Sequence, residues 1–134
     1  MSKIAVSTQH APGAIGPYSQ AVKVGDLVFC SGQIALSPET GELMQGGVEV
    51  ETRQVLDNLT AVLAAAGASW ADVVRTTIYL TDLSHFSLVN RLYSERVIAP
   101  PPARTTIQVA ALPRGGLVEI DAIAHLGKAS PSAT

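Results

Sequence analysis

A short strand is predicted by the stretch Pro101-Pro102-Ala103-Arg104-Thr105-Thr106-Ile107-Gln108-Val109-Ala110, on which both the fold and the candidate site depend. The prolines at 100–102 hold the backbone before the strand extended. Successive side chains of a strand point to opposite faces, so Arg104, Thr106 and Gln108 share one face. We expect the opposite face, with Thr105, Ile107 and Val109, to pack on the core and the Arg104 face to be exposed.

A second strand with mixed character is predicted over residues 117–124. One of its faces carries only Val118, Ile120, Ala122 and Ala124, and this face is expected to pack beneath helices. Glu119 lies on the other face, so we expect it to share an exposed sheet face with Arg104. Such a face is too apolar for water and too charged for a core, which indicates an oligomer interface that encloses a small polar pocket.

The other elements follow from changes in the hydrophobic period. Strands are expected near residues 3–7, 22–24, 27–31 and 73–81, with a hairpin turn at Gly25-Asp26. A three-turn apolar stripe predicts a helix from Val48 that ends at Gly67, with Glu51 and Asn58 outside the stripe. A second helix is expected over 83–97, with Asp82 as its N-cap.

This order of elements, β-β-β-α-β-α-β-β, contains no internal repeat. Two helices cannot cover both faces of a six-stranded sheet, so the sequence predicts an α+β two-layer domain with both helices packed on one face. A chain of 134 residues fits one domain, which we place at 1–127. The small polar tail, 128–134, is expected to be disordered.

Composition restricts the classes of function. The net charge is −2 without a run of Lys or Arg, which gives no electrostatic footprint for nucleic acid or an anionic membrane. No signal-peptide pattern or long apolar segment is present, so a cytoplasmic protein is expected. The single cysteine, Cys30, is expected to be a buried structural thiol. Because His10, His85 and His125 share no ligand spacing, no metal site is predicted.

Arg104 is the candidate anchor for a ligand carboxylate, because its planar donor fork makes paired, charge-assisted hydrogen bonds. Glu119 would then accept a proton or hold a water molecule. The alternative, which stays open, is that Arg104 and Glu119 only form a structural salt bridge.

Three further positions have a structural and a functional interpretation. Tyr18 follows a Gly-Pro bend and either packs or covers a ligand. Ser31-Gly32, at a strand end, is either a plain turn or a source of amide donors for an oxyanion. Asn90 interrupts the apolar stripe of the second helix, as either a satisfied core amide or a site residue.

Several stretches together resemble the Rid family, also called YjgF-type, of reactive-intermediate deaminases. They occur in the family order and span nearly the whole chain, which makes the match specific. The stretches are Ala14-Ile15-Gly16-Pro17-Tyr18-Ser19-Gln20-Ala21, Ser31-Gly32-Gln33-Ile34, Thr52-Arg53-Gln54-Val55-Leu56-Asp57-Asn58-Leu59, Val89-Asn90 with Tyr93, Pro102-Ala103-Arg104-Thr105-Thr106-Ile107-Gln108-Val109, and Leu117-Val118-Glu119-Ile120.

The resemblance implies a chorismate-mutase-like fold, a homotrimer with three pockets at the subunit interfaces, and no cofactor. It also implies hydrolysis of 2-enamine or 2-imine acids, such as 2-aminoacrylate, 2-iminopropanoate and 2-iminobutanoate, to the 2-keto acid and ammonia. Such intermediates are released by pyridoxal-phosphate-dependent dehydratases that act on serine and threonine.

The resemblance also implies a role for each site residue. Arg104 would bind the substrate carboxylate and Glu119 would orient or activate the attacking water. The positions that would close or line the pocket are Tyr18, Asn90, Ser31 and Gly32. Many members carry cysteine where this chain has Thr106; the family is thought to use the backbone carbonyl there, so activity is expected to survive. The segment 96–100 lacks the aromatic residues common in relatives, which bears on pocket shape.

A second function class fits the same features. A trimeric binding or regulatory module would hold a small carboxylate metabolite without turning it over. Nuclease activity, which has been attributed to parts of the family, is weakly supported because the chain lacks a basic patch.

Overall fold

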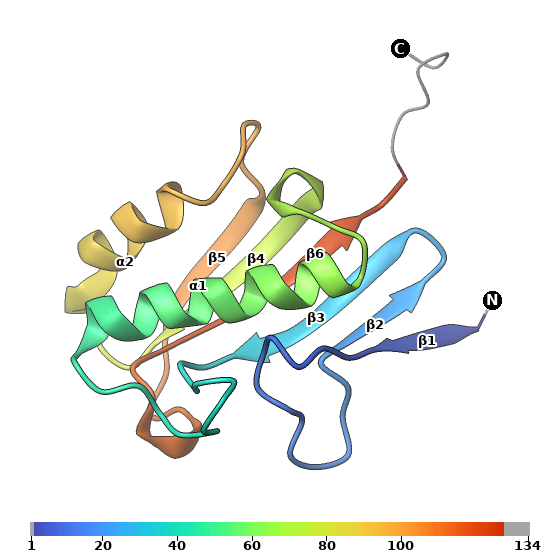
Figure 1. Ribbon diagram of the computed structural model, residues 1–134. Coiled ribbons are helices and arrows are strands. Elements are labelled where there is room, and N and C mark those ends of the chain that lie inside the picture. Colours follow the sequence, from blue (N-terminus) through green and yellow to red (C-terminus); the bar gives the residue numbers. More distant parts are fainter. Residues whose placement is uncertain (1, 128–134) are drawn as a thin grey trace.

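A six-stranded mixed sheet runs through the molecule in the order β1-β2-β3-β6-β4-β5 (Figure 1). The computed structural model describes residues 2–127, so the tail predicted to be disordered, 128–134, lies outside the described residues. The strands are β1 (Lys3–Val6), β2 (Ala21–Val24), β3 (Leu27–Gln33), β4 (Val73–Leu80), β5 (Ala103–Gln108) and β6 (Val118–His125). The helices are α1 (Val48–Ala65) and α2 (Phe86–Ser94). Neighbouring strands are antiparallel except β4 and β5, which are parallel.

The predicted order of elements is confirmed, and so are two of the local signals behind it. Gly25, with a φ of 57°, forms the turn that joins β2 to β3. Gly67, with a φ of 84°, follows the end of α1, and the Ala68 N–H donates to the carbonyl of Leu63. Glycine adopts this left-handed conformation without the steric cost of a Cβ, which is why both signals could be recognised in the sequence.

The second helix is shorter than the predicted 83–97. Asp82 is an N-cap, but of a separate 3-10 turn, Leu83–His85, in which its carboxylate accepts from the Ser84 N–H at 2.8 Å. The N-cap of α2 itself is His85, so the predicted role of Asp82 at the start of that helix is wrong. The Leu83 N–H donates instead to the side chain of Gln108 at 2.9 Å, which ties this turn to the end of β5. Helical spacing of apolar residues could not distinguish the 3-10 turn from the first turn of an α-helix.

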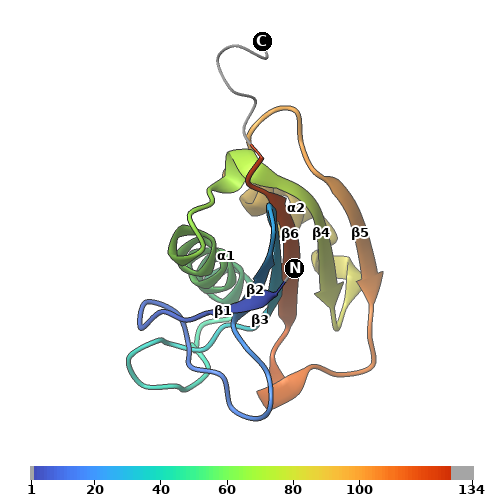
Figure 2. The ribbon, with the colours of Figure 1, turned by 90° about the vertical axis from the view of Figure 1, so that its right-hand side faces the viewer.

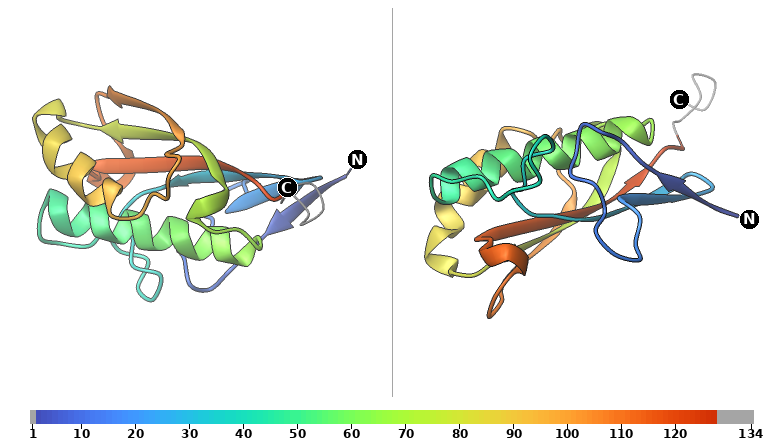
Figure 3. Two further views of the ribbon diagram at one scale, coloured as in Figure 1. Left: turned by 90° about the horizontal axis from the view of Figure 1, so that it is seen from above. Right: turned by 60° about the horizontal axis from the view of Figure 1, so that its bottom comes forward.

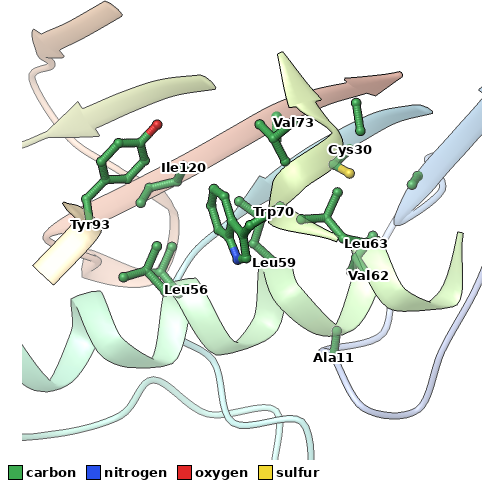
Figure 4. Packing of buried hydrophobic residues seen from close by; sticks show 14 of the residues in the cluster. Ala11, Cys30, Leu56, Leu59, Val62, Leu63, Trp70, Val73, Tyr93 and Ile120 are labelled. Carbon is green, nitrogen blue, oxygen red and sulfur yellow. The ribbon is translucent and has the colours of Figure 1, made fainter. Parts of the chain in front are cut away.

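Both helices pack on one face of the sheet, as predicted (Figures 2 and 3). Leu56, Leu59 and Leu63 of α1 are fully buried against the apolar face of β6. In Figure 4, Trp70 lies between α1 and the strands, and Tyr93 of α2 extends toward the same layer. The Trp70 and Tyr93 rings meet edge to face with centroids 6.1 Å apart. Burial of each large apolar side chain contributes about 1.5–3 kcal/mol, so this layer is the main source of stability.

The opposite face, which we call the open face, is not covered by any element of residues 2–127. It exposes apolar side chains, with Leu27 38% exposed, Phe29 42% and Ile107 41%. Glu119 and Asp121 lie on this face as well, because Val118 and Ile120 of the alternate parity are buried beneath the helices. The β6 parity predicted from the sequence is therefore confirmed.

The predicted orientation of β5 is wrong. In the parallel register Arg104 is opposite Thr76 and Thr106 is opposite Ile78, and both β4 residues are buried beneath the helices. Arg104 and Thr106 therefore face the helix layer, while Ile107 is on the open face. Side chains at one register position of neighbouring strands point to the same face of the sheet. Pairing with β4 therefore sets the orientation of β5, although the apolar residues of β5 alone would favour the opposite orientation.

Within residues 2–127, no helix is long and apolar enough to span a membrane. No group of three or more His, Cys, Asp or Glu side chains in this part of the chain could hold a metal ion.

A buried carboxylate links α1 to the start of β6. Glu51 is 4% exposed, and its Oε1 accepts from the Leu117 N–H at 2.8 Å. Burial raises the pKa of Glu51 above its ordinary value of 4.5, although the Leu117 hydrogen bond opposes this shift. The folded chain therefore binds this proton more tightly than the unfolded chain, and stability falls as pH rises from 4.5 through the raised pKa.

We predict that Glu51→Gln, which keeps the acceptor and removes the charge, raises the free energy of unfolding at pH 7 and flattens its fall above pH 4.5. Glu51→Ala should instead cost about 1–3 kcal/mol, because the buried Leu117 N–H loses its acceptor. Urea unfolding between pH 4 and 8 measures both effects, with Glu49→Gln in the same helical turn as the control. An identical pH slope in wild type and Glu51→Gln would contradict the prediction.

Candidate functional site

The Arg104 guanidinium is held on the helix side of the sheet by three side chains of α2. Its Nη1 donates to Asn90 Oδ1 at 2.8 Å. Its central carbon lies 5.1 Å from the ring centroid of Tyr93 and 5.7 Å from that of Phe86. We call Arg104, Asn90, Phe86 and Tyr93 the Arg104 cluster. The sequence allows Asn90 to be either a satisfied core amide or a site residue; it is half-buried, and its side-chain oxygen accepts from Arg104, so it is not a core amide.

A cavity of about 500 Å³ lies beside this cluster, between α2 and the proline-containing segment that leads into β5. Pro101 and Pro102 line it together with Asn90, Tyr93 and Arg104. Because β5 is an edge strand, the cluster is at the rim of the domain and not in its centre. An anion that approaches this edge can therefore reach the guanidinium.

Thr106 is on the same face of β5 as Arg104, two residues further along. Its Oγ1 is buried and has no hydrogen-bond partner among residues 2–127. A buried hydroxyl without a partner costs free energy, so such groups often mark a place where a ligand or another chain supplies the missing contact.

Glu119 lines a second cavity, of about 490 Å³, which shares no lining residue with the first. The predicted residues Tyr18, Ser31 and Gly32 line the same cavity. Its apolar wall consists of Ile15, Ile34, Leu36, Pro12 and Pro113. We call this space the Glu119 cavity.

Gly32 allows the Glu119 carboxylate to lie directly against the backbone of β3. A Cβ placed on Gly32 would be 2.8 Å from Glu119 Cδ and closer still to its Oε2. The pairing of β3 with β6 shifts between Cys30 and Gln33, so Ser31-Gly32 forms a bulge. Ser31 Oγ donates to the Ser19 carbonyl at 2.6 Å, which ties this bulge to the loop that carries Tyr18.

The pKa of Glu119 is raised above its ordinary value, first because the carboxylate is desolvated and second because Asp121 carries a like charge nearby. Among residues 2–127, no Lys or Arg lies within ion-pair distance of Glu119. The structural salt bridge between Arg104 and Glu119, an alternative left open by the sequence, is therefore not formed within this chain.

Gln20, which sequence analysis did not identify, organises the loop before β2. It is 4% exposed; its Oε1 accepts from the Thr8 N–H at 2.7 Å and its Nε2 donates to the Pro12 carbonyl at 2.7 Å. Tyr18 is held at the Gly-Pro bend by a backbone hydrogen bond to Gly16 and remains 54% exposed. Gln20 lay within the matched stretch around Tyr18, but nothing in its neighbours indicated that its amide would be buried.

Two more residues around the Glu119 cavity were missed. Asn58 is fully buried on α1, and its Nδ2 donates to the carbonyls of Ile34 and Leu36, which fixes the loop behind the cavity. Arg114 lines the cavity from a left-handed backbone conformation with a φ of 62°.

Cys30 is a buried thiol, as predicted. Its burial, with a smaller effect of Asp121, raises its pKa to about 12.

The structure thus divides the predicted site residues into two groups. Arg104, Asn90 and Thr106 are together on the helix side, whereas Glu119, Tyr18, Ser31 and Gly32 are together at the Glu119 cavity. Arg104 is opposite Thr76 and Glu119 is opposite Tyr79, two β4 positions of opposite parity. The prediction that Arg104 and Glu119 share one sheet face is therefore wrong, and the cavity beside the Arg104 cluster and the Glu119 cavity have no lining residue in common.

Comparison with known proteins gives a consistent result. A family model described as Endoribonuclease L-PSP matches residues 8–126. The chain is 51% identical over 126 residues to Reactive Intermediate Deaminase A, chloroplastic, of Arabidopsis thaliana, covering 94% of this chain and 67% of the plant protein. It is 48% identical over 122 residues to the 2-iminobutanoate/2-iminopropanoate deaminase of Homo sapiens, covering 91% of this chain and 89% of the human protein.

The solved structure of E. coli TdcF with bound serine is similar with a TM-score of 0.85 and 41% sequence identity, over 91% of this chain and 98% of that chain. The family model covers most of the chain, including every predicted site residue, and the resemblance noted in the sequence is confirmed. The chain belongs to the Endoribonuclease L-PSP family and, within it, to the Rid-type reactive-intermediate deaminase proteins.

Proposed function

We propose that this chain hydrolyses 2-imino carboxylic acids and their 2-enamino tautomers, such as 2-aminoacrylate with 2-iminopropanoate, and 2-iminobutanoate. Water adds to the imine carbon and the C–N bond then breaks, so R–C(=NH)–COO⁻ and H₂O give R–C(=O)–COO⁻ and NH₃. The observation that carries the proposal is an oriented guanidinium in the same chain as a desolvated carboxylate, Glu119, that forms no ion pair among residues 2–127. The names of the plant and human relatives support the reaction class.

The assembly is part of the proposal. Three copies would pack through their open faces as a chorismate-mutase-like homotrimer, with the Arg104 cluster, at the β5 edge of one copy, against the Glu119 cavity of the next. The exposed Leu27, Phe29 and Ile107 support this, because a contact between copies would remove their apolar surface from water. So does the position of Arg104 on an edge strand, where a neighbouring copy can reach it.

In this site Arg104 binds the substrate carboxylate through its donor fork. Asn90 holds one end of the guanidinium, and Thr106 contacts the ligand through its backbone carbonyl or through the hydroxyl that has no partner among residues 2–127. Tyr18 closes the pocket, and Ser31 and Gly32 line it.

Glu119 accepts a proton from the attacking water and returns it to the departing nitrogen. The raised pKa of Glu119 is closer to neutral pH than that of an ordinary glutamate. A carboxyl group with such a pKa can both accept a proton from water and donate it to the nitrogen, which favours this role over that of a permanently ionised group. The protonated imine carbon is already electrophilic, so positioning of the acid and the water supplies most of the rate acceleration, and no cofactor is needed.

A non-catalytic binding module is the second candidate. The bound serine named for TdcF favours it, because that relative holds a small amino acid. The two functions differ in one measurable property: a binding module would retain affinity for a 2-keto acid and would not accelerate hydrolysis of the imine.

The reaction predicts distinct defects for the two charged residues. Arg104→Ala should raise KM by about a hundredfold, since the carboxylate loses its paired charge-assisted hydrogen bonds. Glu119→Gln should lower kcat by about 10²–10⁴-fold, because an amide cannot accept the proton. Ammonia release from 2-aminoacrylate generated in situ measures both, with Arg91→Ala on the surface of α2 as the control. A wild-type rate no faster than that of Arg104→Ala would falsify the proposed reaction.

The shared site predicts complementation between two inactive variants. Arg104→Ala and Glu119→Gln chains, unfolded together in equal amounts and refolded, should regain about a quarter of wild-type activity, because each mixed trimer contains one intact site. Each variant refolded alone is the control, and sedimentation establishes the oligomeric state. If the mixture stays as inactive as its components although mixed trimers form, Arg104 and Glu119 do not share a site between copies.

The contact between Gly32 and Glu119 predicts a further defect. In Gly32→Ala the new Cβ displaces the flexible end of Glu119, so kcat should fall at least tenfold while the melting temperature changes little. Gly13→Ala is the matched control, because Gly13 lines the same cavity and a Cβ there would meet nothing within 4 Å. Equal activity of the two variants would show that the position of the carboxylate against Gly32 is not important for the reaction.

A further inference from the structure

Arg104 needs more than its position on β5 to act as an anchor. An arginine side chain has several rotatable bonds, and holding it in one orientation costs conformational entropy of about 2 kcal/mol. Asn90 provides its only hydrogen bond among residues 2–127, and this bond uses Nη1. A single bond at one end of the guanidinium leaves its plane free to rotate.

Two aromatic rings of α2 supply a further constraint. Their centroids lie 5.1 Å (Tyr93) and 5.7 Å (Phe86) from the central carbon of the guanidinium, within the distance at which a cation is attracted to a ring face. Phe86, Asn90 and Tyr93 are spaced i, i+4 and i+7, so one face of α2 presents ring, amide and ring to Arg104. This arrangement leaves the other donors of the fork available for a ligand.

The two rings are fixed to different extents. Tyr93 is 4% exposed, its hydroxyl lies 2.6 Å from Thr76 Oγ1, and the Trp70 ring meets it edge to face. Phe86 is the first residue of α2, is 38% exposed and lies outside the buried core. Core packing therefore accounts for the position of Tyr93 but not for that of Phe86, whose ring lies against the charge of Arg104.

We propose that Phe86 and Tyr93 are positioning residues that orient the Arg104 guanidinium through cation–π contacts and thereby set the affinity of the site for a carboxylate. The proposal rests on the proposed function for the role of Arg104, but it concerns carboxylate binding and does not require turnover. Loss of the Phe86 ring raises KM about threefold to tenfold with little change in kcat. Tyr93→Phe retains the ring and has a smaller effect than Tyr93→Leu.

The test replaces Phe86 with other natural residues and, by site-specific incorporation, with fluorinated phenylalanines. Phe86 lies outside the buried core, so these changes leave the core packing undisturbed. Phe86→Trp should preserve or strengthen carboxylate affinity and Phe86→Leu should weaken it. A series of phenylalanines with increasing ring fluorination, which weakens the negative ring face at nearly constant size, should weaken it in steps. Leu83→Ala, an exposed apolar residue in the turn before α2 that is not part of the Arg104 cluster, is the control. The readouts are KM and kcat for 2-iminopropanoate and the calorimetric Kd of 2-oxobutanoate, a stable carboxylate.

The two readouts separate failure of this inference from failure of the proposed function. If wild type binds 2-oxobutanoate but does not accelerate imine hydrolysis, the proposed reaction fails and the fluorination series still tests the rings through Kd. The cation–π proposal is overturned if Phe86→Leu leaves the affinity for 2-oxobutanoate unchanged. It is also overturned if Phe86→Leu lowers this affinity but increasing ring fluorination does not. A stepwise loss of affinity without a parallel loss of kcat or of melting temperature supports it.

Discussion

The alternation of side chains along β4 is the constraint on which the rest of the structure depends. This strand pairs with β6 on one side and with β5 on the other, so its parity sets the faces of both neighbours. Thr76, Ile78 and Leu80 are buried beneath the helices. Arg104 lies opposite one of these buried positions, and Glu119 lies opposite Tyr79 of the other parity. The two charged residues are thereby separated by the sheet that carries them.

This separation changes the chemistry of each residue. Beside Arg104, Glu119 would be stabilised in its ionised form; on the open face, burial and Asp121 raise its pKa instead. Arg104, which forms no ion pair within residues 2–127, is held by an amide and two rings and keeps donors for an external anion. The fold thus avoids an internal ion pair that would neutralise both groups. In the assembly that we propose, the two groups meet only across a contact between copies.

Several features of the chain lower the stability of a single copy, and the proposed assembly accounts for all of them. The open face leaves Phe29 and Ile107 partly exposed to water, and the buried hydroxyl of Thr106 has no partner in the described part of the chain. Glu119 is desolvated and forms no ion pair with any of the described residues. Natural proteins keep such destabilising features mainly at functional sites, where a ligand or another chain binds and where function limits the stability that the fold can reach.

The sequence by itself determined the elements, their order and the family. Short-range sequence patterns predict local structure. In this chain these patterns are the apolar stripe of α1, the turn glycines Gly25 and Gly67, and the alternation of side chains along β6. Tertiary structure alone decided the orientation of β5, because a strand with a polar face and a weakly apolar face takes its orientation from the neighbouring strand. It also decided that Gln20 and Asn58 are buried, since their partners are backbone carbonyls of other segments. The sequence identified Arg104 and Glu119 as a pair, whereas pairing across β4 placed them on opposite faces of one chain.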